Sequence, residues 1–350
     1  MEVTERLSRR GHAVHLVYRN DGAFLNQYQG FCASVSRIAY PGGARLEPFS
    51  AAAAAVMASV RARSLRSGIS YLNALTDLPV AMIRSAPAVL HLREPPPRRY
   101  LRIWASLLRR VAGCIAVSQT VADSFVNRFP MLEGRVVVVH SGVDPDHYRP
   151  ATEHERSAAR SALGFESEEV VLLYAGRLSP DKGIPVLLRA VEQTQPARLR
   201  LVVAGGPDSF RPKLASHRYA SWLRSVAPPG TAFVGARSDN VSLFHAADMV
   251  VLPSTWDEPF SRVVLEAMAC GVPVLASRKG GTPEAYEGLE HYLFDDVPQL
   301  TRLIDQLLTM GDERRRDLGA RMRGHVAERF PLERAVDRIE QVLATTASQH

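Results

Sequence analysis

The sequence predicts an α/β protein made of two doubly wound domains, each built on a parallel sheet. Short apolar runs alternate with amphipathic helical runs along the chain, which is typical of strands that helices cover on both faces. The 350 residues, 46% of them hydrophobic, exceed what one hydrophobic core usually spans. A stretch rich in proline and charge, 144–168, interrupts the alternation near the middle. Two domains joined by a linker follow from these observations.

Strand-like runs give the order of the elements. They lie at 13–18, 88–92, 112–117 and 135–140 in the first half, and at 170–174, 199–204, 233–235, 249–253 and 272–277 in the second. The expected parts are a first domain at 1–150, a linker at 151–168, a second domain at 169–329 and a C-terminal helical segment at 330–350. The last segment follows a break at Phe330-Pro331, and we expect it to pack back across the domain junction.

Composition points to a reducing compartment. The cysteines, Cys32, Cys114 and Cys270, are far apart and form no C-x-x-C pair, which argues against a disulfide framework and a zinc site. The N-terminus is charged where a secretory signal needs an apolar core, and no run of about 18 apolar residues occurs. We therefore expect a cytoplasmic protein.

The net charge is +7, and the pI is 9.6. A positive field concentrates any polyanion, so this charge fits nucleic acid, an anionic membrane surface or a phosphorylated ligand equally well. No recognised nucleic-acid-binding module accompanies it, and we expect no nucleic-acid partner.

The second domain opens with VVLLYAGRLSPDKG, a strand followed by a short loop that carries Arg177 and Lys182. In open α/β sheets, ligands bind at the carboxyl ends of the strands. Two cations in this loop could hold a diphosphate, Arg as a planar fork and Lys as a point charge. The alternative is a solvated turn in which Gly176 supplies an unusual backbone angle.

A second motif, EPFSRVVLEAMACGVPVLAS, predicts a helix that Ser261 caps and that ends at Gly271. The N-terminus of a helix is a ready phosphate site. Glu258 precedes this helix and Glu266 lies in its second turn, so both could accept hydrogen bonds from the vicinal diols of a sugar. The alternative is a solvated helix face.

The motifs AGRLSPDKG, VVAGGPD, FVG, HAADMVVLPS, EPFSRVVLEAMACGVPVLAS and GGTPE, in that order, resemble the C-terminal domain of glycosyltransferase family 4. The resemblance covers about residues 170–284. It implies a GT-B fold, in which two Rossmann-like domains face each other across a cleft, and a retaining transfer without a cofactor. Because no carboxylate cluster is credible as a metal site, Arg177, Lys182 and helix amides would stabilise the charge, and we expect the transfer to be metal-independent. The donor would be a nucleotide-diphosphate sugar, and UDP-sugars and GDP-sugars are the leading candidates.

The resemblance also implies residue roles. Arg177 and Lys182 would bind the donor diphosphate, Glu258 the hydroxyls of the transferred sugar, and Glu266 the ribose. The same motifs place Gly176, Gly235, Phe260, Ser261, Arg262 and Val263 among the donor-binding residues. The family usually has Gly where this chain has Ser261, a change that affects how closely the backbone approaches the sugar.

The first half is also similar to the family in LSRRGHAVHLVY, GCIAVSQTVADSF and VVVVHSGVDPDHY. The family begins with a further strand and a glycine-rich loop, whereas here Met1 falls almost inside the first helix, so we expect the first strand to be missing. His91 and Arg93 alternate along one strand and share a face. His91 is a candidate catalytic residue, and Arg93 and Glu94 are acceptor-side candidates. The family's histidine aligns better with Arg93, and the alternative for His91 is a structural histidine.

Two further segments each have a structural and a functional interpretation. Asp144-Pro145-Asp146 matches the D-x-D metal motif but lies in the expected linker, and we interpret it as structural and expect no metal site. The segment Arg98–Arg110 sets Tyr100, Ile103, Trp104 and Leu107 among arginines, which would suit the anionic inner face of a membrane. A helix that covers the first domain's sheet is the commoner case.

The expected function is transfer of a sugar to a glycan or glycolipid acceptor of the cell envelope. Glycosylation of a small-molecule natural product is the close alternative. A nucleotide-sugar epimerase of the same fold and a shortened, non-catalytic sugar-nucleotide binder remain further alternatives. No G-x-G-x-x-G follows a strand and opens a helix, so a dinucleotide-dependent oxidoreductase is poorly supported.

Overall fold

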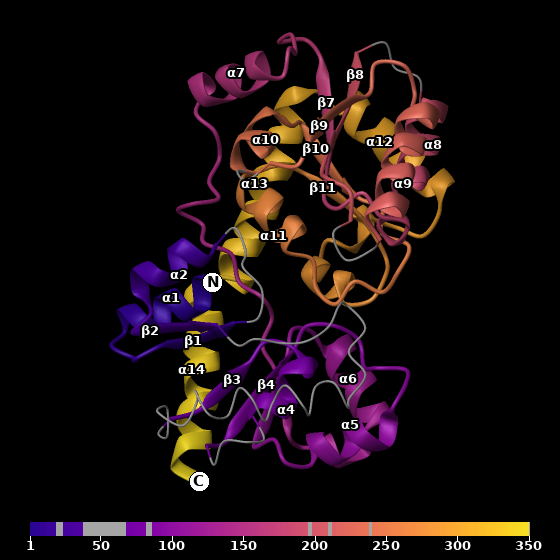
Figure 1. Cartoon of the computed structure of the whole chain (residues 1–350). Coiled ribbons are helices and arrows are strands. Elements are labelled where there is room, and N and C mark those ends of the chain that lie inside the picture. Colours follow the sequence, from indigo (N-terminus) through magenta and orange to yellow (C-terminus); the bar gives the residue numbers. More distant parts are fainter. Residues whose placement is uncertain are drawn as a thin grey trace. The chain divides into compact units, whose positions relative to one another are not determined.

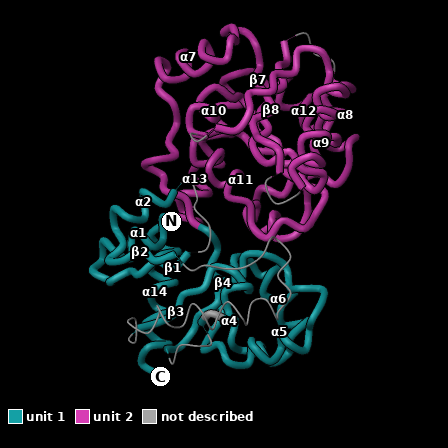
Figure 2. The backbone as a smooth tube through the Cα atoms, in the orientation of Figure 1, with its two compact units in different colours: residues 1–141, 332–350 teal, residues 142–331 magenta. Residues whose placement is uncertain are grey.

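The computed structural model describes residues 1–18, 24–37, 68–81, 86–194, 198–208, 212–237 and 240–349. The chain forms two compact α/β units (Figure 2). Unit 1 comprises residues 1–141 and 332–350, and unit 2 comprises residues 142–331. All strand pairs within the two units are parallel in the described residues, which confirms the predicted fold class.

Unit 2 is built on a six-stranded sheet in the described residues, with the order β12-β11-β10-β7-β8-β9 (Figure 1). Its strands are β7 (Val170–Ala175), β8 (Leu199–Ala204), β9 (Ala232–Gly235), β10 (Met249–Leu252), β11 (Val274–Ser277) and β12 (Leu293–Phe294). Its helices are α7 (Glu153–Ala162), α8 (Ile184–Thr194), α9 (Lys213–Val226), α10 (Val241–Ala246), α11 (Arg262–Ala269), α12 (Val297–Thr309) and α13 (Asp312–Arg329). The chain proceeds from β7 outward to β9 and then returns to the other side of β7 with β10. The strand order therefore reverses between β7 and β10, and this reversal is the kind of place where α/β sheets bind ligands.

Unit 1 contains a four-stranded sheet, β3-β4-β5-β6, and a separate pair, β1-β2, within the described residues. Its strands are β1 (His15–Tyr18), β2 (Ser34–Arg37), β3 (Ser70–Leu72), β4 (Ala88–Leu92), β5 (Gly113–Ala116) and β6 (Val136–Val138). Its helices are α1 (Glu2–Arg9), α2 (Leu25–Phe31), α4 (Leu78–Ala81), α5 (Leu101–Leu108), α6 (Gln119–Arg128) and α14 (Leu332–Gln349). In the described part of the chain no strand precedes α1.

Helix α14 completes the core of unit 1 although it follows unit 2 in the sequence. Its Ala335 and Ile339 pack in one buried cluster with Val89, Ile115 and Val139 of the β4-β5-β6 region. On the outer side, Arg10 forms ion pairs with three carboxylates of α14 at 2.5 to 2.7 Å, namely Glu333, Asp337 and Glu340. The C-terminal segment thus belongs to unit 1 because its apolar face finds its partners there.

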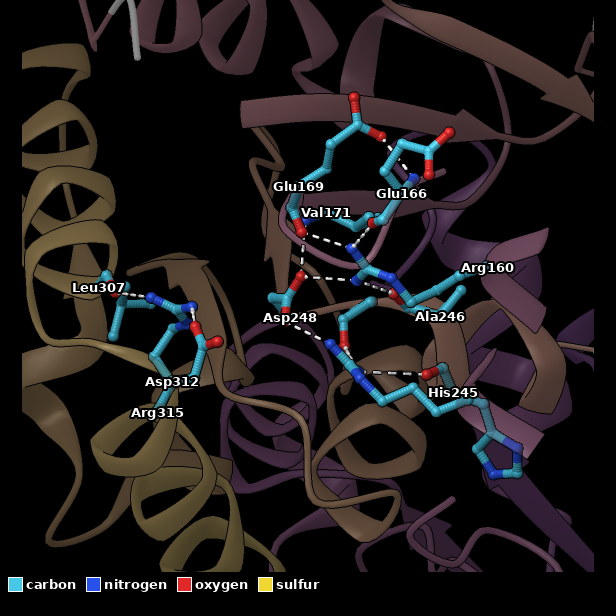
Figure 3. Close-up of polar contacts among 12 residues, drawn as sticks. Arg160, Glu166, Glu169, Val171, His245, Ala246, Asp248, Leu307, Asp312 and Arg315 are labelled. Atoms are coloured by element: carbon cyan, nitrogen blue, oxygen red, sulfur yellow. Dashed lines mark hydrogen bonds and ion pairs between the residues drawn. The ribbon is translucent and has the colours of Figure 1, made fainter. Parts of the chain in front are cut away.

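The expected linker, residues 151–168, contains helix α7, which packs against α10 in unit 2. Thr152 and Glu155 form a capping box at its start. Arg160, at the end of α7, lies 3.0 Å from Asp248 and donates to the main-chain oxygen of Glu166 at 2.7 Å (Figure 3). Asp248 also accepts from the backbone N–H of Val171 at 2.7 Å, so one carboxylate joins α7 to β7. The segment is a fixed part of unit 2 because its arginines are bonded to the start of the sheet.

Candidate functional site

The loops after β7 and β10 meet at the carboxyl edge of the unit 2 sheet, on either side of the strand-order reversal. The backbone N–H of Thr255 donates to the carbonyl of Asp181 at 3.0 Å. Gly183 has a φ of +65°, and a Cβ there would lie 1.8 Å from the carbonyl oxygen of Pro253. Only glycine allows this approach, which brings Lys182 next to the β10 loop.

Lys182 and Glu258 form the closest ion pair of this edge, with 2.5 Å between Nζ and Oε1. The Lys182 side chain is 15% exposed and the Glu258 side chain 8%. Ser254 donates its hydroxyl to the same carboxylate oxygen at 2.5 Å, and the Lys182 ammonium lies 5.8 Å from the centre of the Trp256 ring. The main-chain oxygen of Glu258 accepts from Gly281 at 2.7 Å, which ties in the loop after β11. A cation and a carboxylate are therefore held together in a largely desolvated place.

Arg177 lies in the same β7 loop but is paired differently. Its guanidinium is 3.0 Å from the carboxylate of Asp208 and 3.9 Å from that of Asp181. Tyr174 donates its hydroxyl to the main-chain oxygen of Arg177 at 2.8 Å. Asp208 is buried and follows β8. The sequence analysis does not single it out as a site residue, although it is the last residue of the VVAGGPD motif, and that motif could have indicated it.

Helix α11 begins after Ser261, as the motif predicts, but the Ser261 side chain forms no capping hydrogen bond. Ser261 therefore occupies the expected N-cap position without the expected side-chain bond, and the residue is buried. Glu266 is buried, and Arg262 approaches it at 3.1 Å from one turn earlier in the helix. Phe260 packs its ring 5.6 Å from that of Phe330 in the core of unit 2, and Val263 is half-buried.

The two glycines of the expected donor site differ in position. Gly176 directly follows β7 and has no positive φ, so the unusual backbone angle of the alternative interpretation is absent there. Its carbonyl oxygen lies 1.8 Å from where a Cβ of Gly205 would be, so the two loops touch backbone to backbone. Gly235 ends β9 with a φ of +74°, and β8 separates that strand from β7.

Several buried polar atoms at the carboxyl edge have no hydrogen-bond partner among the described residues. They are Ser179 Oγ in the β7 loop, Trp256 Nε1 in the β10 loop, Ser277 Oγ at the end of β11 and Thr282 Oγ1 just beyond it. Leaving a buried donor unsatisfied costs roughly 1–3 kcal/mol. Such atoms together with a desolvated ion pair suit a polar, charged ligand.

A cavity of about 1160 Å³ lies at the opposite, amino edge of the same sheet. Its lining includes Arg156, Arg160, Asp248 and Arg315. These arginines are already bonded to the chain, since Arg156 and Arg160 contact Asp248, and Arg315 donates to the main-chain oxygen of Leu307 at 2.8 Å (Figure 3). The four unsatisfied atoms named above lie at the carboxyl edge, whereas Arg160 Nε is a buried atom of the cavity lining without a partner among the described residues. Cavity volume alone therefore does not locate the site.

In unit 1, His91 is the penultimate residue of β4 and is 5% exposed. Its Nδ1 is hydrogen-bonded to the Tyr71 hydroxyl and lies 3.2 Å from a guanidinium nitrogen of Arg93. Burial lowers the pKa of His91 well below its ordinary value, and the Arg93 charge lowers it further. Arg93 and Glu94 are exposed. Tyr71 was missed by sequence analysis because its strand has only three residues and no preceding apolar run.

The remaining candidate segments have structural roles in the described residues. The Asp144 carboxylate accepts from the backbone N–H of Asp146 at 3.0 Å and of His147 at 3.3 Å, which makes a local turn. No group of three or more His, Cys, Asp or Glu side chains that could hold a metal ion occurs in the part of the chain that the structure describes.

The Arg98–Arg110 segment contains α5 (Leu101–Leu108), in which Trp104 and Leu108 are buried. The apolar face expected on the membrane is thus partly covered by unit 1 itself, because α5 packs against α4. Among the described residues, no helix combines the length and apolar character needed to cross a membrane.

Two family models match the chain, Glycosyltransferase Family 4 over residues 1–147 and Glycosyl transferases group 1 over residues 155–325. YtcC of Bacillus subtilis is 32% identical over 253 residues, covering 67% of this chain and 61% of that protein. A D-inositol 3-phosphate glycosyltransferase of Mycobacterium sp. (strain KMS) is 36% identical over 207 residues, covering 56% of this chain and 45% of that protein. The chain thus spans about half to three fifths of the length of these curated relatives.

Solved structures show the fold. HepE of Anabaena, in complex with UDP and glucose, matches with a TM-score of 0.82 at 23% identity, covering 98% of this chain and 94% of that one. A glycosyltransferase from Rickettsia africae matches with a TM-score of 0.81 at 18% identity, covering 99% and 93%. With family models over both halves and GT-B neighbours over nearly its whole length, the chain belongs to glycosyltransferase family 4 and has the two-domain GT-B fold.

Proposed function

We propose that this chain is a retaining glycosyltransferase that moves a sugar from a nucleotide-diphosphate sugar to an acceptor hydroxyl. The observation that carries the proposal is the desolvated Lys182–Glu258 pair at the strand-order reversal of unit 2, next to buried polar atoms that have no partner in the described part of the chain. A diphosphate needs cations, and a sugar needs carboxylate acceptors for its hydroxyls. The carboxyl edge of unit 2 offers both within one ion pair.

In this proposal Arg177 and Lys182 neutralise the charge that develops on the departing diphosphate. Glu258 accepts hydrogen bonds from the transferred sugar, and Glu266 accepts them from the ribose. Lys182 must then exchange part of its contact with Glu258 for a phosphate oxygen, so donor binding and release of the carboxylate occur together. No metal ion or cofactor is assigned a role, and turnover in the presence of a chelator is the expected behaviour.

The donor is proposed to be a UDP-sugar. Support comes from HepE of Anabaena, which was solved with UDP and with UDP-glucose and shares the fold. A GDP-sugar is the next candidate. The reaction is proposed to retain the anomeric configuration, with the acceptor attacking from the face that the diphosphate leaves. The acceptor oxygen bonds to the anomeric carbon as the carbon–phosphate oxygen bond breaks, and the departing oxygen takes the acceptor proton. An inverted product anomer, seen by NMR, contradicts this route.

The acceptor is proposed to be a glycan or glycolipid of the cell envelope, and the protein to work in the cytoplasm. The exposed arginines of the α5 region, including Arg98, Arg109 and Arg110, would support peripheral contact with an anionic membrane through charge. Binding to anionic vesicles that is unchanged after Arg109→Ala and Arg110→Ala contradicts the membrane contact.

A second acceptor class has its own support. The mycobacterial relatives carry a name that specifies D-inositol 3-phosphate, a small phosphorylated polyol. A small soluble acceptor is therefore the second candidate. Offering this chain a UDP-sugar with either inositol 3-phosphate or a lipid extract, and following release of UDP, distinguishes the two.

The first experiment is thermal unfolding with and without UDP, GDP, ADP and dTDP. A ligand at 100 times its dissociation constant stabilises by about 2.7 kcal/mol. We expect UDP to raise the melting temperature of the wild type, and Lys182→Ala and Glu266→Ala to lose that rise. The controls are Lys213→Ala on α9 and Glu313→Ala on α13, which are exposed and should keep it. A response to UDP that both site variants retain overturns the donor assignment.

Turnover assays then separate the reaction types. Release of UDP with a glycosylated acceptor supports transfer. A changed sugar on an intact nucleotide means an epimerase, and nucleotide binding without either product means a non-catalytic binder.

A further inference from the structure

A three-residue cluster in unit 1 restricts the chemistry of His91. Tyr71 lies opposite Val89 in the β3-β4 pairing, so Tyr71 and His91 share one face of the sheet. Their rings are 5.7 Å apart at 42°, and the Tyr71 hydroxyl bonds His91 Nδ1. Arg93 places a guanidinium nitrogen 3.2 Å from the same Nδ1. Two groups therefore approach one ring nitrogen.

The chemistry of these partners determines the state of the ring. A guanidinium can only donate, and a tyrosine hydroxyl can donate its proton. Nδ1 must therefore be the acceptor, and the proton of a neutral imidazole must sit on Nε2. Burial raises the pKa of Tyr71, against the lowering effect of Arg93, so the hydroxyl keeps its proton.

The other ring nitrogen is left open. His91 Nε2 is buried and has no hydrogen-bond partner among the described residues. With its proton on Nε2, the ring presents one N–H donor that the described chain does not satisfy. An oxygen of a bound substrate would satisfy it.

We propose that Tyr71, with the support of Arg93, is a positioning residue that holds His91 as a neutral imidazole protonated on Nε2. His91 then serves the reaction as a hydrogen-bond donor to a substrate oxygen and not as a base. Only this last step rests on the proposed function, because the state of the ring is a property of the free protein.

The ring state is measured on the ¹⁵N-labelled full chain by long-range ¹H–¹⁵N correlation at neutral pH. His91→Gln identifies the His91 signals by their loss. We expect the wild type to show a protonated Nε2 and an unprotonated Nδ1. In Tyr71→Phe the form protonated on Nδ1 should gain population. The control Tyr292→Phe, at a tyrosine of unit 2 whose ring packs against His291, should leave the signals unchanged. A wild-type ring protonated on Nδ1, or a Tyr71→Phe ring identical to the wild type, overturns the proposal.

Activity gives an independent readout. A glutamine side chain can place an amide N–H near the position of Nε2 and has no tautomers. We expect Tyr71→Phe to lower kcat about tenfold in the wild type but less than about twofold in the His91→Gln background. His91→Asn, whose amide is too short, should not rescue. An equal loss in both backgrounds means that Tyr71 is merely structural and contradicts the positioning role.

The turnover assay and the NMR measurement test the proposed function and the ring state of His91 independently. If no donor gives turnover, the proposed function fails while the NMR measurement still decides the ring state. If turnover occurs but the ring is protonated on Nδ1, the proposed function stands and the role of Tyr71 is wrong.

Discussion

The two edges of the unit 2 sheet both concentrate ion pairs but differ in how completely these pairs are satisfied. At the amino edge, Asp248 is held by Arg156, Arg160 and the N–H of Val171, and Arg160 also donates to main-chain oxygens (Figure 3). At the carboxyl edge, the loops around Lys182–Glu258 carry four buried polar atoms that lack partners among the described residues, on Ser179, Trp256, Ser277 and Thr282.

The difference separates stabilising charges from charges that await a ligand. A buried charge that is paired and hydrogen-bonded within the chain, as Asp248 is, joins elements of the fold. Beside a buried charge with unsatisfied donors, a ligand can supply the missing hydrogen-bond acceptors, and this lowers the free energy of the complex. Substitutions of charged residues at the amino edge should therefore change stability but not nucleotide binding. Substitutions of charged residues at the carboxyl edge should change nucleotide binding or turnover more than stability.

The largest expected effect is on the stability of the amino edge. Asp248→Ala leaves two arginines without their carboxylate, which should lower the free energy of unfolding by about 3–5 kcal/mol. Denaturant unfolding measures it, and the response to UDP should persist below the new melting temperature. Asp312→Ala is the control, because that carboxylate is 71% exposed in its pair with Arg315 and should cost less than about 1 kcal/mol. Loss of UDP binding in folded Asp248→Ala would break the comparison.

The next effect tests the contact between the two loops. Gly183→Ala forces a Cβ toward the Pro253 carbonyl. The free energy of unfolding should fall by about 1–3 kcal/mol more than the positive φ alone would lower it. Gly230→Ala is the control, since Gly230 also has a positive φ, +81°, but open space around it. We expect UDP affinity, measured by calorimetry, to fall only in Gly183→Ala. Equal affinities in the two variants would mean that the loop contact does not position Lys182.

Glu258→Gln separates binding from turnover at the carboxyl edge. The amide can keep the hydrogen bond from Ser254 but loses the charge that holds Lys182. We expect kcat to fall by about 10²-fold, the usual size for one lost electrostatic contact to a transition state. UDP affinity should stay the same or rise, because the diphosphate no longer competes with the Glu258 carboxylate for Lys182. A parallel loss of UDP affinity and kcat would place Glu258 on the nucleotide instead of the sugar.

The smallest effect concerns the pair on α11. Arg262 is nearly half exposed and one turn from Glu266, so Arg262→Ala should change the free energy of unfolding by no more than about 0.5 kcal/mol. Thermal unfolding against Arg314→Ala, an exposed arginine of α13, measures the difference. A loss above about 1 kcal/mol would show that the carboxyl edge also contributes to stability.

The sequence predicts best what local pattern controls. Apolar runs such as those of β7 and β10 are located to within a residue or two, because burial on both faces leaves no polar interruption. The short strands β3 and β12, and the polar strand β2, gave no such signal. The motif residues of the β7 and β10 loops were found as well, since motifs are local.

Pairings between distant residues could not be predicted. Lys182 and Glu258 are 76 positions apart, and only the strand order puts their loops together. Arg160 and Asp248 are 88 positions apart, and their contact attaches the segment expected as a linker to unit 2. The strand order brings these two residues together as well. The partner of His91, Tyr71, depends on the β3-β4 register, which no periodicity in three residues reveals.

The placement of α14 has a consequence for synthesis on the ribosome. Unit 2 is one continuous stretch of chain, whereas unit 1 is encoded in two parts that flank it. Unit 2 can therefore fold as soon as residue 331 emerges, while the apolar cluster around Val89 and Ile115 waits for Ala335 and Ile339. The half that is translated first is therefore the half that finishes folding last.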